Sequence, residues 1–391
     1  MMRERFEVND GPASLPLLRE PTGTSPLVAY GLAGLRHCWM PERGTWSHKF
    51  HLDGRKTPNE SVPHSDLYYS LNVLLGFARV RGAVSGEPYD IPVLFRTLCE
   101  AASGGDVRKG ACGMALWAAA ELDLDTPGAM AGKLRGFASD ISPLASWTAQ
   151  DVGLTLSGAA AQAHRDPSWR PLAKALRDLL LSRFCGPGAL FHDSGSGPRR
   201  QFATFATQVY VALALYQYAA LAQDAQAVGA ANACVRKLLE LQGPLGEWPW
   251  FYRPGPDRVL DFYEVYSVHQ HGMAPALLHH AVRHEVPGAR EAIVKGFEWL
   301  FGRNELGVTM LVPELSLMYR SQARRGSAGR RSTRLLRAGA KVLTGRKGVP
   351  AGAGALRLTQ EMRSYEYGWL LWSFGDRADY PELTHRAEFV A

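Results

Sequence analysis

Helical periodicity runs through most of the chain, and two kinds of helix alternate along it. Segments that start near residues 67, 110, 146, 203, 265 and 364 are apolar nearly all round, whereas those near 126, 168, 224 and 288 carry a charged face. A helix that is apolar all round is buried, and one with a charged face lies at the surface. The alternation predicts an all-α fold, an α/α toroid with about six inner and five to six outer helices around a central cavity.

Clusters of Pro, Gly, Asp and Ser separate the predicted helices, which cover about 67–80, 90–102, 110–121, 126–138, 146–163, 168–184, 203–222, 224–242, 265–284, 288–302 and 364–374. Residues 1–60, rich in Pro, Gly and polar residues, are expected to form an irregular N-terminal arm with a short helix near Tyr30 to Cys38. Residues 61–391 would form the toroid, without convincing alternating strands. An open solenoid of helical pairs is the alternative, which the unequal spacing of the inner helices disfavours.

The charge is distributed less evenly than the composition suggests. The formal net charge is +7, but no acid occurs between Glu314 and Glu361, where eleven basic residues lie. The rest of the chain therefore carries a net charge of −4, and about 317–357 is a basic insertion ahead of the last inner helix. Residues 332–347 fit a short basic amphipathic helix, and residues 320–331 before it are expected to be flexible.

A solvated loop would explain this insertion without a function. The functional interpretation is that the segment between Arg320 and Lys347 binds an anionic membrane surface or an anionic glycan. Nucleic acid is not an expected partner, because interleaved aromatic residues are lacking.

The cysteines and the apolar stretches indicate a location in the cytoplasm. The five cysteines are scattered without a CxxC, so reduced thiols are expected rather than a disulfide framework. No secretory signal is visible, and the longest apolar stretch, 211–222, is too short to span a bilayer. We therefore expect a cytoplasmic protein that could lie peripherally at the inner membrane.

Three residues at the end of the 224–242 helix resemble a known element. Gln242, Gly246 and Trp248 match the Q-x-x-x-G-x-W element of terpenoid cyclases and related α/α toroids. In that family the Gln caps a helix end and the Trp stacks against it, so the resemblance implies the same tie between adjacent helices. The D-x-D-D run of those cyclases is absent, and the nearest run, Asp123 to Thr126, lacks the last acid.

Two longer blocks, 246–275 and 363–369, resemble an uncharacterised bacterial family associated with cell-surface polysaccharide gene clusters. That resemblance implies an α/α toroid and a glycan-related role. Six-hairpin glycosidases and LanC-like cyclases share the architecture, and the latter bind zinc with two Cys and one His. Cys185-Gly186 and His271-Gly272 are only fragments of that arrangement, so neither a metal nor a cofactor is expected.

The segment from Trp248 to His271 is the richest in chemistry, because aromatic rings stack on sugars and carboxylates hydrogen-bond hydroxyls. Its substrate-binding candidates are Trp248, Trp250, Tyr252, Glu264 and Gln270, and its catalytic candidates are Tyr263, Tyr266, His269 and His271.

On a helix over 265–284, Tyr266, His269 and Gln270 would share a face, with Tyr263 one turn earlier. A Tyr–His pair suits proton abstraction next to a carboxylate, as in uronate lyases or epimerases. Glu264 and His271 would point elsewhere. A second interpretation stays open, because a Tyr and a His on a buried helix more often satisfy each other or a backbone carbonyl.

A second block opens the last inner helix. Glu366 is its catalytic candidate, and Glu361, Arg363 and Tyr365 are its binding candidates. In the functional interpretation, the carboxylate acts as an acid or base and Arg363 binds an anionic group. In the structural interpretation, an Arg–Glu pair caps the helix. Closure of the toroid would place this block beside the block of His269.

Polar residues that open the other inner helices would line the same mouth, although capping and packing also explain them. They are Asp66, Tyr68, Tyr69, Asn72, Trp147, Gln150, Asp151, Gln201, Thr204, Thr207 and Gln208.

The preferred function is an enzyme acting on a cell-surface polysaccharide or a lipid-linked glycan by lyase, epimerase or hydrolase chemistry. An isoprenoid-processing, terpenoid-cyclase-like enzyme and a non-catalytic glycan-binding toroid are the alternatives. A polar groove with Trp and carboxylates would favour a glycan, a deep apolar pocket an isoprenoid, and a filled centre a scaffold.

Overall fold

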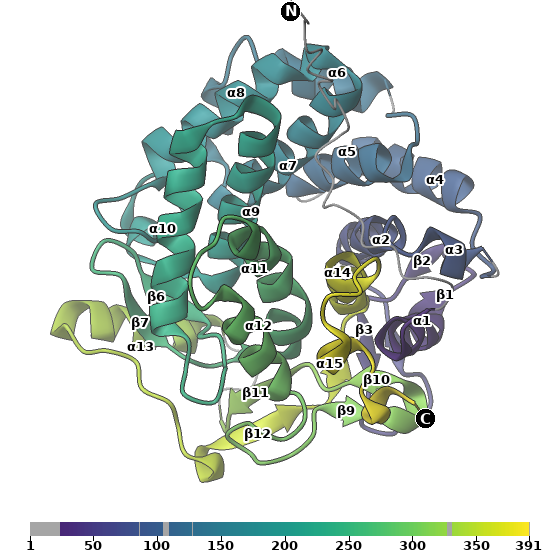
Figure 1. Ribbon diagram of the computed structural model, residues 1–391, viewed down its shortest axis with the longest axis vertical. Helices are drawn as coiled ribbons and strands as arrows, with labels where there is room; N and C mark the ends of the chain where they lie inside the picture. Colours follow the sequence, from purple (N-terminus) through teal and green to yellow (C-terminus); the bar gives the residue numbers. More distant parts are fainter. Residues whose placement is uncertain (1–23, 86, 105–108, 127, 327–330, 391) are drawn as a thin grey trace, which may run out of the picture.

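A closed ring of inner helices forms the centre of the protein, as the sequence predicts (Figure 1). The computed structural model describes residues 24–85, 87–104, 109–126, 128–326 and 331–390. Each inner helix packs against the next, and the last closes onto the first. The inner helices are α2 (Pro63–Phe77), α5 (Gly110–Leu122), α7 (Ala149–Arg165), α9 (Phe205–Ala222), α11 (Ala274–Arg283) and α14 (Ser364–Phe374).

A second layer of helices surrounds this ring. It consists of α1 (Pro26–Cys38), α4 (Ile91–Gly104), α6 (Gly128–Gly136), α8 (Arg170–Leu179), α10 (Ala225–Leu241) and α12 (Ala289–Glu298). Helix α1 packs against α14, so the described part of the expected irregular arm is integrated into the toroid. Ser25 accepts a hydrogen bond from the Val28 amide, and Pro26 opens the helix, which together give α1 a well-defined start.

Small β-sheets cover the N-terminal ends of the inner helices. The three-stranded sheets have the orders β5-β6-β7, β12-β11-β8 and β13-β3-β4, and β5, β8 and β13 lead directly toward α9, α11 and α14. The strands contain two to four residues, too few for a recognisable alternation in sequence. They are β3 (Lys49–His51), β4 (Asn59–Glu60), β5 (Ala203–Thr204), β6 (Phe251–Arg253), β7 (Arg258–Asp261), β8 (Val265–Tyr266), β11 (Ser321–Arg324), β12 (Leu356–Thr359) and β13 (Glu361–Met362).

The described residues form two further strand pairs and three further α-helices, besides short 3-10 and π-helical turns. The pairs are β1 (Trp39–Met40) with β2 (Thr45–Trp46) and β9 (Leu311–Val312) with β10 (Leu317–Met318); the helices are α3 (Arg81–Val84), α13 (Arg331–Thr344) and α15 (Pro381–Thr384).

The middle of the ring is filled rather than hollow. Trp369 of α14 is completely buried, and its ring lies 6.1 Å from that of Trp117 on α5 and 5.7 Å from that of Tyr210 on α9. Helices α2 and α14 meet backbone to backbone, because a Cβ on Gly76 would lie 2.5 Å from the Gly368 carbonyl oxygen. The expected central cavity is therefore displaced, and the cavity described below lies at the C-terminal ends of the inner helices.

The tie expected after α10 is present. The Gln242 side-chain amide donates to the carbonyl oxygens of Gly246, at 2.9 Å, and of Ala292 on α12, at 3.2 Å. Trp248 stacks on Phe205 of α9 with ring centroids 5.2 Å apart. The element thus joins α9, α10 and α12.

Helix α9 is long and apolar enough to cross a membrane by length and composition, because it extends the expected stretch 211–222 back to Phe205. However, 72% of it is buried inside the fold, which is the environment of a core helix.

The basic insertion is attached to the toroid over much of its length. Contrary to the expected flexibility after residue 320, strand β11 pairs with both β8 and β12. Helix α13 docks on the β6–β7 hairpin: Lys341 donates to the Leu260 carbonyl at 2.7 Å, and Ala338 is buried against Phe251 and Leu260. Residues 327–330 lie outside the described residues.

Candidate functional site

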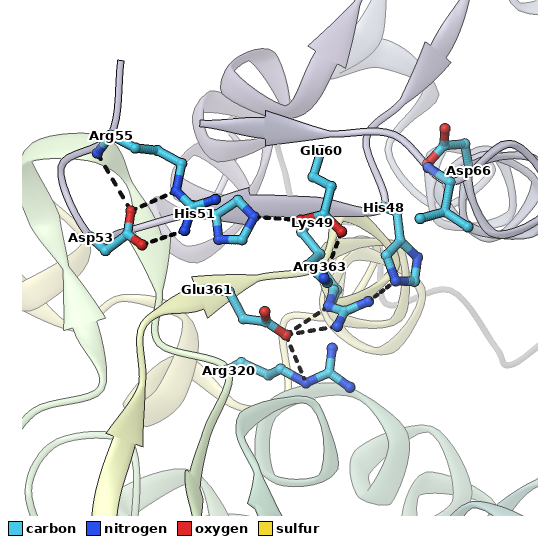
Figure 2. Close-up of polar contacts among 11 residues, drawn as sticks. His48, Lys49, His51, Asp53, Arg55, Glu60, Asp66, Arg320, Glu361 and Arg363 are labelled. Atoms are coloured by element: carbon cyan, nitrogen blue, oxygen red, sulfur yellow. Dashed lines mark hydrogen bonds and ion pairs between the residues drawn. The ribbon is translucent and has the colours of Figure 1, made fainter. Parts of the chain in front are cut away.

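Arg320 joins the two sequence blocks at the N-terminal end of the ring, and Figure 2 shows its ion pair with Glu361 of the second block. Its guanidinium carbon lies 4.9 Å from the ring centroid of Tyr266. Its Nε atom is 3.5 Å from Glu361 Oε1, and its Nη1 atom is 4.0 Å from Glu366 Oε1. The side chain is only 14% exposed. We call this group, with His269, Trp250, Arg363, His48, Tyr69 and Tyr365, the Arg320 cluster.

The two carboxyl groups of the cluster have opposite pKa shifts. Burial raises the pKa of Glu361, but the nearby Arg363 and Arg320 outweigh it and hold this pKa below its usual range. Arg363 contributes two hydrogen bonds to Glu361 Oε1, at 3.0 and 2.7 Å. Glu366 is completely buried, and burial raises its pKa to about 8 despite the same arginines. At neutral pH Glu361 is therefore ionised, whereas Glu366 holds a proton.

Glu366 also lacks hydrogen bonds. Neither of its carboxyl oxygens has a hydrogen-bond partner among the described residues, and the same holds for Arg320 Nη1, which faces Glu366 only as an ion pair at 4.0 Å. Buried polar atoms in native proteins are normally hydrogen-bonded, so a buried carboxyl with a raised pKa and no hydrogen bond marks a candidate proton donor.

Tyr266 and His269 contact each other, but not as neighbours on one helix. Tyr266 ends β8, and His269 starts a π-helical turn, His269–Met273, which precedes α11. The two rings are 5.1 Å apart, and the Phe205 ring lies 4.7 Å from that of His269. Burial, reinforced by the charge of Arg320, lowers the pKa of His269 to about 3, so the imidazole is a neutral base.

The expectation that Gln270 shares the face of Tyr266 and His269 is wrong. Its amide donates to the Tyr266 carbonyl, and its side-chain oxygen lies against Gly296 of α12. The extra residue in a π-turn rotates the following side chains, and such turns are frequent at functional sites.

The other predicted residues lie in different surroundings. The Tyr263 hydroxyl donates to Glu305 at 2.8 Å. His271 is completely buried 6.5 Å from the Tyr367 ring, and Tyr252 is also completely buried. Together with Trp248 on Phe205, these side chains belong to the packing around the cluster. Glu264, half-buried, precedes β8.

Trp250 and Tyr365 contribute aromatic faces to the cluster. Trp250 lies 5.1 Å from Tyr266, and Tyr365 lies 4.5 Å from Tyr69 of α2. Their partly exposed rings can stack on a sugar.

Sequence reasoning missed Arg320 and His48 as site residues. His48 stacks on Tyr69 with centroids 5.0 Å apart and is hydrogen-bonded to Arg363 (Figure 2). Burial, then the charge of Arg363, lowers its pKa to about 3. It precedes β3, and the pairing of β3 with β13 brings it to the cluster, which no local pattern in the sequence signals.

The part of the chain that the structure describes contains no group of three or more His, Cys, Asp or Glu placed to hold a metal ion. The chemistry available from the cluster itself is proton donation by Glu366, proton acceptance by His269, and binding of an anionic group by Arg320 or Arg363.

The fold is similar to solved carbohydrate-active proteins. An unsaturated glucuronyl hydrolase specific for heparin matches with a TM-score of 0.54 and 10% identity, over 93% of this chain and 97% of that one. A possible member of the GH105 family from Salmonella enterica serovar Paratyphi A matches with a TM-score of 0.55 and 12% identity, over 95% and 98%. A polysaccharide lyase matches with a TM-score of 0.51 and 11% identity, over 91% and 97%. These likenesses identify the α/α toroid fold. No family model and no curated protein matches the sequence.

Proposed function

We propose that the protein is an enzyme that acts on a cell-surface polysaccharide or a lipid-linked glycan, with proton transfer in the Arg320 cluster. The observation that carries this proposal is the opposite protonation of Glu361 and Glu366 around one guanidinium. Pairs of titratable groups whose environments separate their pKa values are the pattern of acid/base catalysis. The fold neighbours, named as a glucuronyl hydrolase and a polysaccharide lyase, support a glycan substrate.

In this proposal Arg320 binds an anionic group of the glycan, and Trp250 and Tyr365 stack on its rings. Glu366 donates a proton to the departing oxygen, and neutral His269 or Tyr266 removes a proton where the reaction requires it. Since Glu366 is completely buried behind mostly buried Arg320, the substrate must draw the arginine away for the carboxyl to reach it. An anionic substrate would do this by pairing with the guanidinium. Elimination, epimerisation and hydrolysis are all compatible with these roles.

The test is a screen of the full chain against uronate-containing oligosaccharides and lipid-linked glycans, following reducing ends, the absorbance of unsaturated uronates and epimer composition. Glu366→Gln is the diagnostic variant, because the amide imitates the protonated carboxyl and keeps the fold. We expect it to lower turnover by about 10²- to 10⁴-fold. Exposed Glu291 of α12, changed to Gln, is the matched control. Binding without turnover would favour the non-catalytic glycan-binding toroid, and full activity of Glu366→Gln would contradict the assigned donor.

We also propose that the protein is cytoplasmic and meets a lipid-linked substrate at an anionic inner-membrane surface. Beside the β6–β7 hairpin, the surface of the basic insertion exposes Leu336 (73%), Leu343 (88%) and Val349 (66%), next to exposed Arg346 and Lys347. Apolar residues flanked by cations suit an anionic lipid surface, where each basic residue contributes about 1 kcal/mol.

Sedimentation with phosphatidylglycerol-rich vesicles, compared with pure phosphatidylcholine, tests this membrane contact. Leu343→Ser combined with Lys347→Ala should release the protein, whereas the buried-face change Ala338→Gly should not. Equal sedimentation of wild type with both lipids would overturn the proposal.

A further inference from the structure

A cavity of about 380 Å³ lies at the C-terminal ends of the inner helices, at the opposite end of the ring from the Arg320 cluster. All six inner helices or the residues just after them contribute to its wall, through Arg79, Glu121, His164, Tyr216, His280 and Trp372 among others. None of the residues of the Arg320 cluster lines it. The volume is within the range of small-molecule sites.

The cations of this cavity differ in their partners. Arg79 pairs with Glu121 at 3.5 Å and with Asp376 at 3.2 Å, and Arg165 pairs with Asp123 at 2.9 Å. Arg283, at the end of α11, has no hydrogen bond or ion pair with any residue that the structure describes, although it lines the cavity. Its guanidinium is thus available to bind an anion with two parallel hydrogen bonds.

The surroundings of Arg283 are electropositive. Partial burial, followed by the charges of the neighbouring Arg377 and Arg79, lowers its pKa to about 10, against the opposing effect of Asp376 and Asp379. Burial also lowers the pKa of His280 to about 3, and Arg283 is the first of the cations that add to this effect. An anion in the cavity would relieve this repulsion between like charges.

The wall offers flat and polar groups as well as charge. Tyr216 stacks on His280 and His284, with centroids 5.6 and 5.0 Å apart and 9° between the planes in both pairs. The Tyr216 hydroxyl donates to Asn232 at 2.6 Å, which fixes the ring. The side-chain oxygen of Gln217 is buried and has no partner among the described residues. An unpaired acceptor of this kind suits a ligand hydroxyl.

We propose that this cavity is a second binding site, for a small hydroxylated ring that bears an anionic group, a sugar acid or a sugar phosphate. The anionic group pairs with Arg283, and a ring hydroxyl donates to Gln217. The proposal is independent of catalysis at the Arg320 cluster.

Calorimetric titration of the full chain tests the site, with glucuronate, glucose 6-phosphate, inorganic phosphate and neutral glucose as probes. We expect glucuronate or glucose 6-phosphate to bind. Comparison of their affinities identifies whether a carboxylate or a phosphate is preferred. Arg283→Gln should weaken that binding about tenfold or more, since a charge-assisted hydrogen bond is lost. Neutral glucose should bind much more weakly.

Two variants and a control keep the result unambiguous. Ala220, exposed at the cavity wall, changed to Trp should block binding without disturbing the core. Arg303→Gln, an exposed arginine outside the cavity, should leave binding unchanged. Glu366→Gln should also leave it unchanged, which separates this site from the proposed catalytic one.

Absence of binding by every anionic probe, or equal affinity of wild type and Arg283→Gln, would overturn the second site. Binding of inorganic phosphate as tight as that of glucose 6-phosphate would overturn its assignment to a sugar ligand.

Discussion

The two ends of the inner ring place an arginine in opposite environments. At the N-terminal end Arg320 is 14% exposed and lies against two carboxyl groups and the Tyr266 ring. At the C-terminal end Arg283 is exposed, faces a cavity and has no ion-pair partner among the described residues. A buried charge requires partners and shifts their pKa values, whereas an exposed charge stays available to a ligand. This difference is why we propose proton transfer at the first end and ligand binding at the second.

Removal of the side chain that fills the ring centre between the two ends should have the largest effect on stability. Trp369 fills the ring centre between Trp117 and Tyr210. Trp369→Ala would leave a large void there, and we expect a loss of about 3–5 kcal/mol in the free energy of unfolding. Urea denaturation measures it. Trp369→Phe, which keeps an aromatic ring, should lose clearly less; a loss below about 1 kcal/mol for the Ala variant would contradict a filled centre.

Matched substitutions of the two arginines test the comparison directly. Arg320→Gln leaves the ionised Glu361 without one of its buried cationic partners, and we expect a loss of about 3 kcal/mol. Arg283→Gln removes an exposed charge without a described partner and should change stability by less than about 0.5 kcal/mol. Equal effects in parallel urea titrations would remove the distinction between the two ends.

The pH dependence of stability should reveal Glu366. Its pKa of about 8 in the folded state lies above its ordinary value of 4.5, so the folded protein holds a proton that the unfolded chain has lost between these pH values. The stabilising contribution is complete below pH 4.5 and is lost as the pH rises through 8. Between pH 5 and 8, wild type should lose at least about 1.4 kcal/mol relative to Glu366→Gln.

Parallel stability curves for the two proteins over this pH range would mean that the Glu366 carboxyl is not protonated near neutral pH.

His269 should make stability change with pH in the opposite direction, at lower pH. The pKa of His269 is about 3 in the folded state, below its ordinary 6.5, so its contribution is lost as the pH falls from 6.5 toward 3.

Weakening the docking of α13 should have the smallest effect on stability. Lys341→Met removes the hydrogen bond to the Leu260 carbonyl, and we expect a loss of about 1 kcal/mol or less. Leu343→Ser, which changes an 88% exposed side chain, should leave thermal unfolding unchanged. If the two variants behave alike, the attachment of the basic insertion to the β6–β7 hairpin does not depend on Lys341.

Much of the architecture follows from the sequence alone. Apolar helices such as 110–122 and 205–222 have no polar face to present to water, so they must be buried, and their alternation with charged-face helices dictates two rings. The order of the elements and the tie at Gln242 are equally local. The short strands were not predictable, because two to four residues carry no usable period.

The candidate site shows where local information ends. The sequence by itself determined that the blocks of His269 and Glu366 open adjacent inner helices, since ring closure brings the last helix beside the fifth. Only the tertiary structure decided that Arg320, from a segment defined by its charge, lies between them, and that His48 reaches Arg363 from the N-terminal segment. Strand pairings between distant residues place these side chains, and burial in that assembly sets the protonation of Glu361 and Glu366. Neither the strand pairing nor the burial can be predicted from a local periodicity, because both depend on contacts between segments that are distant in the sequence.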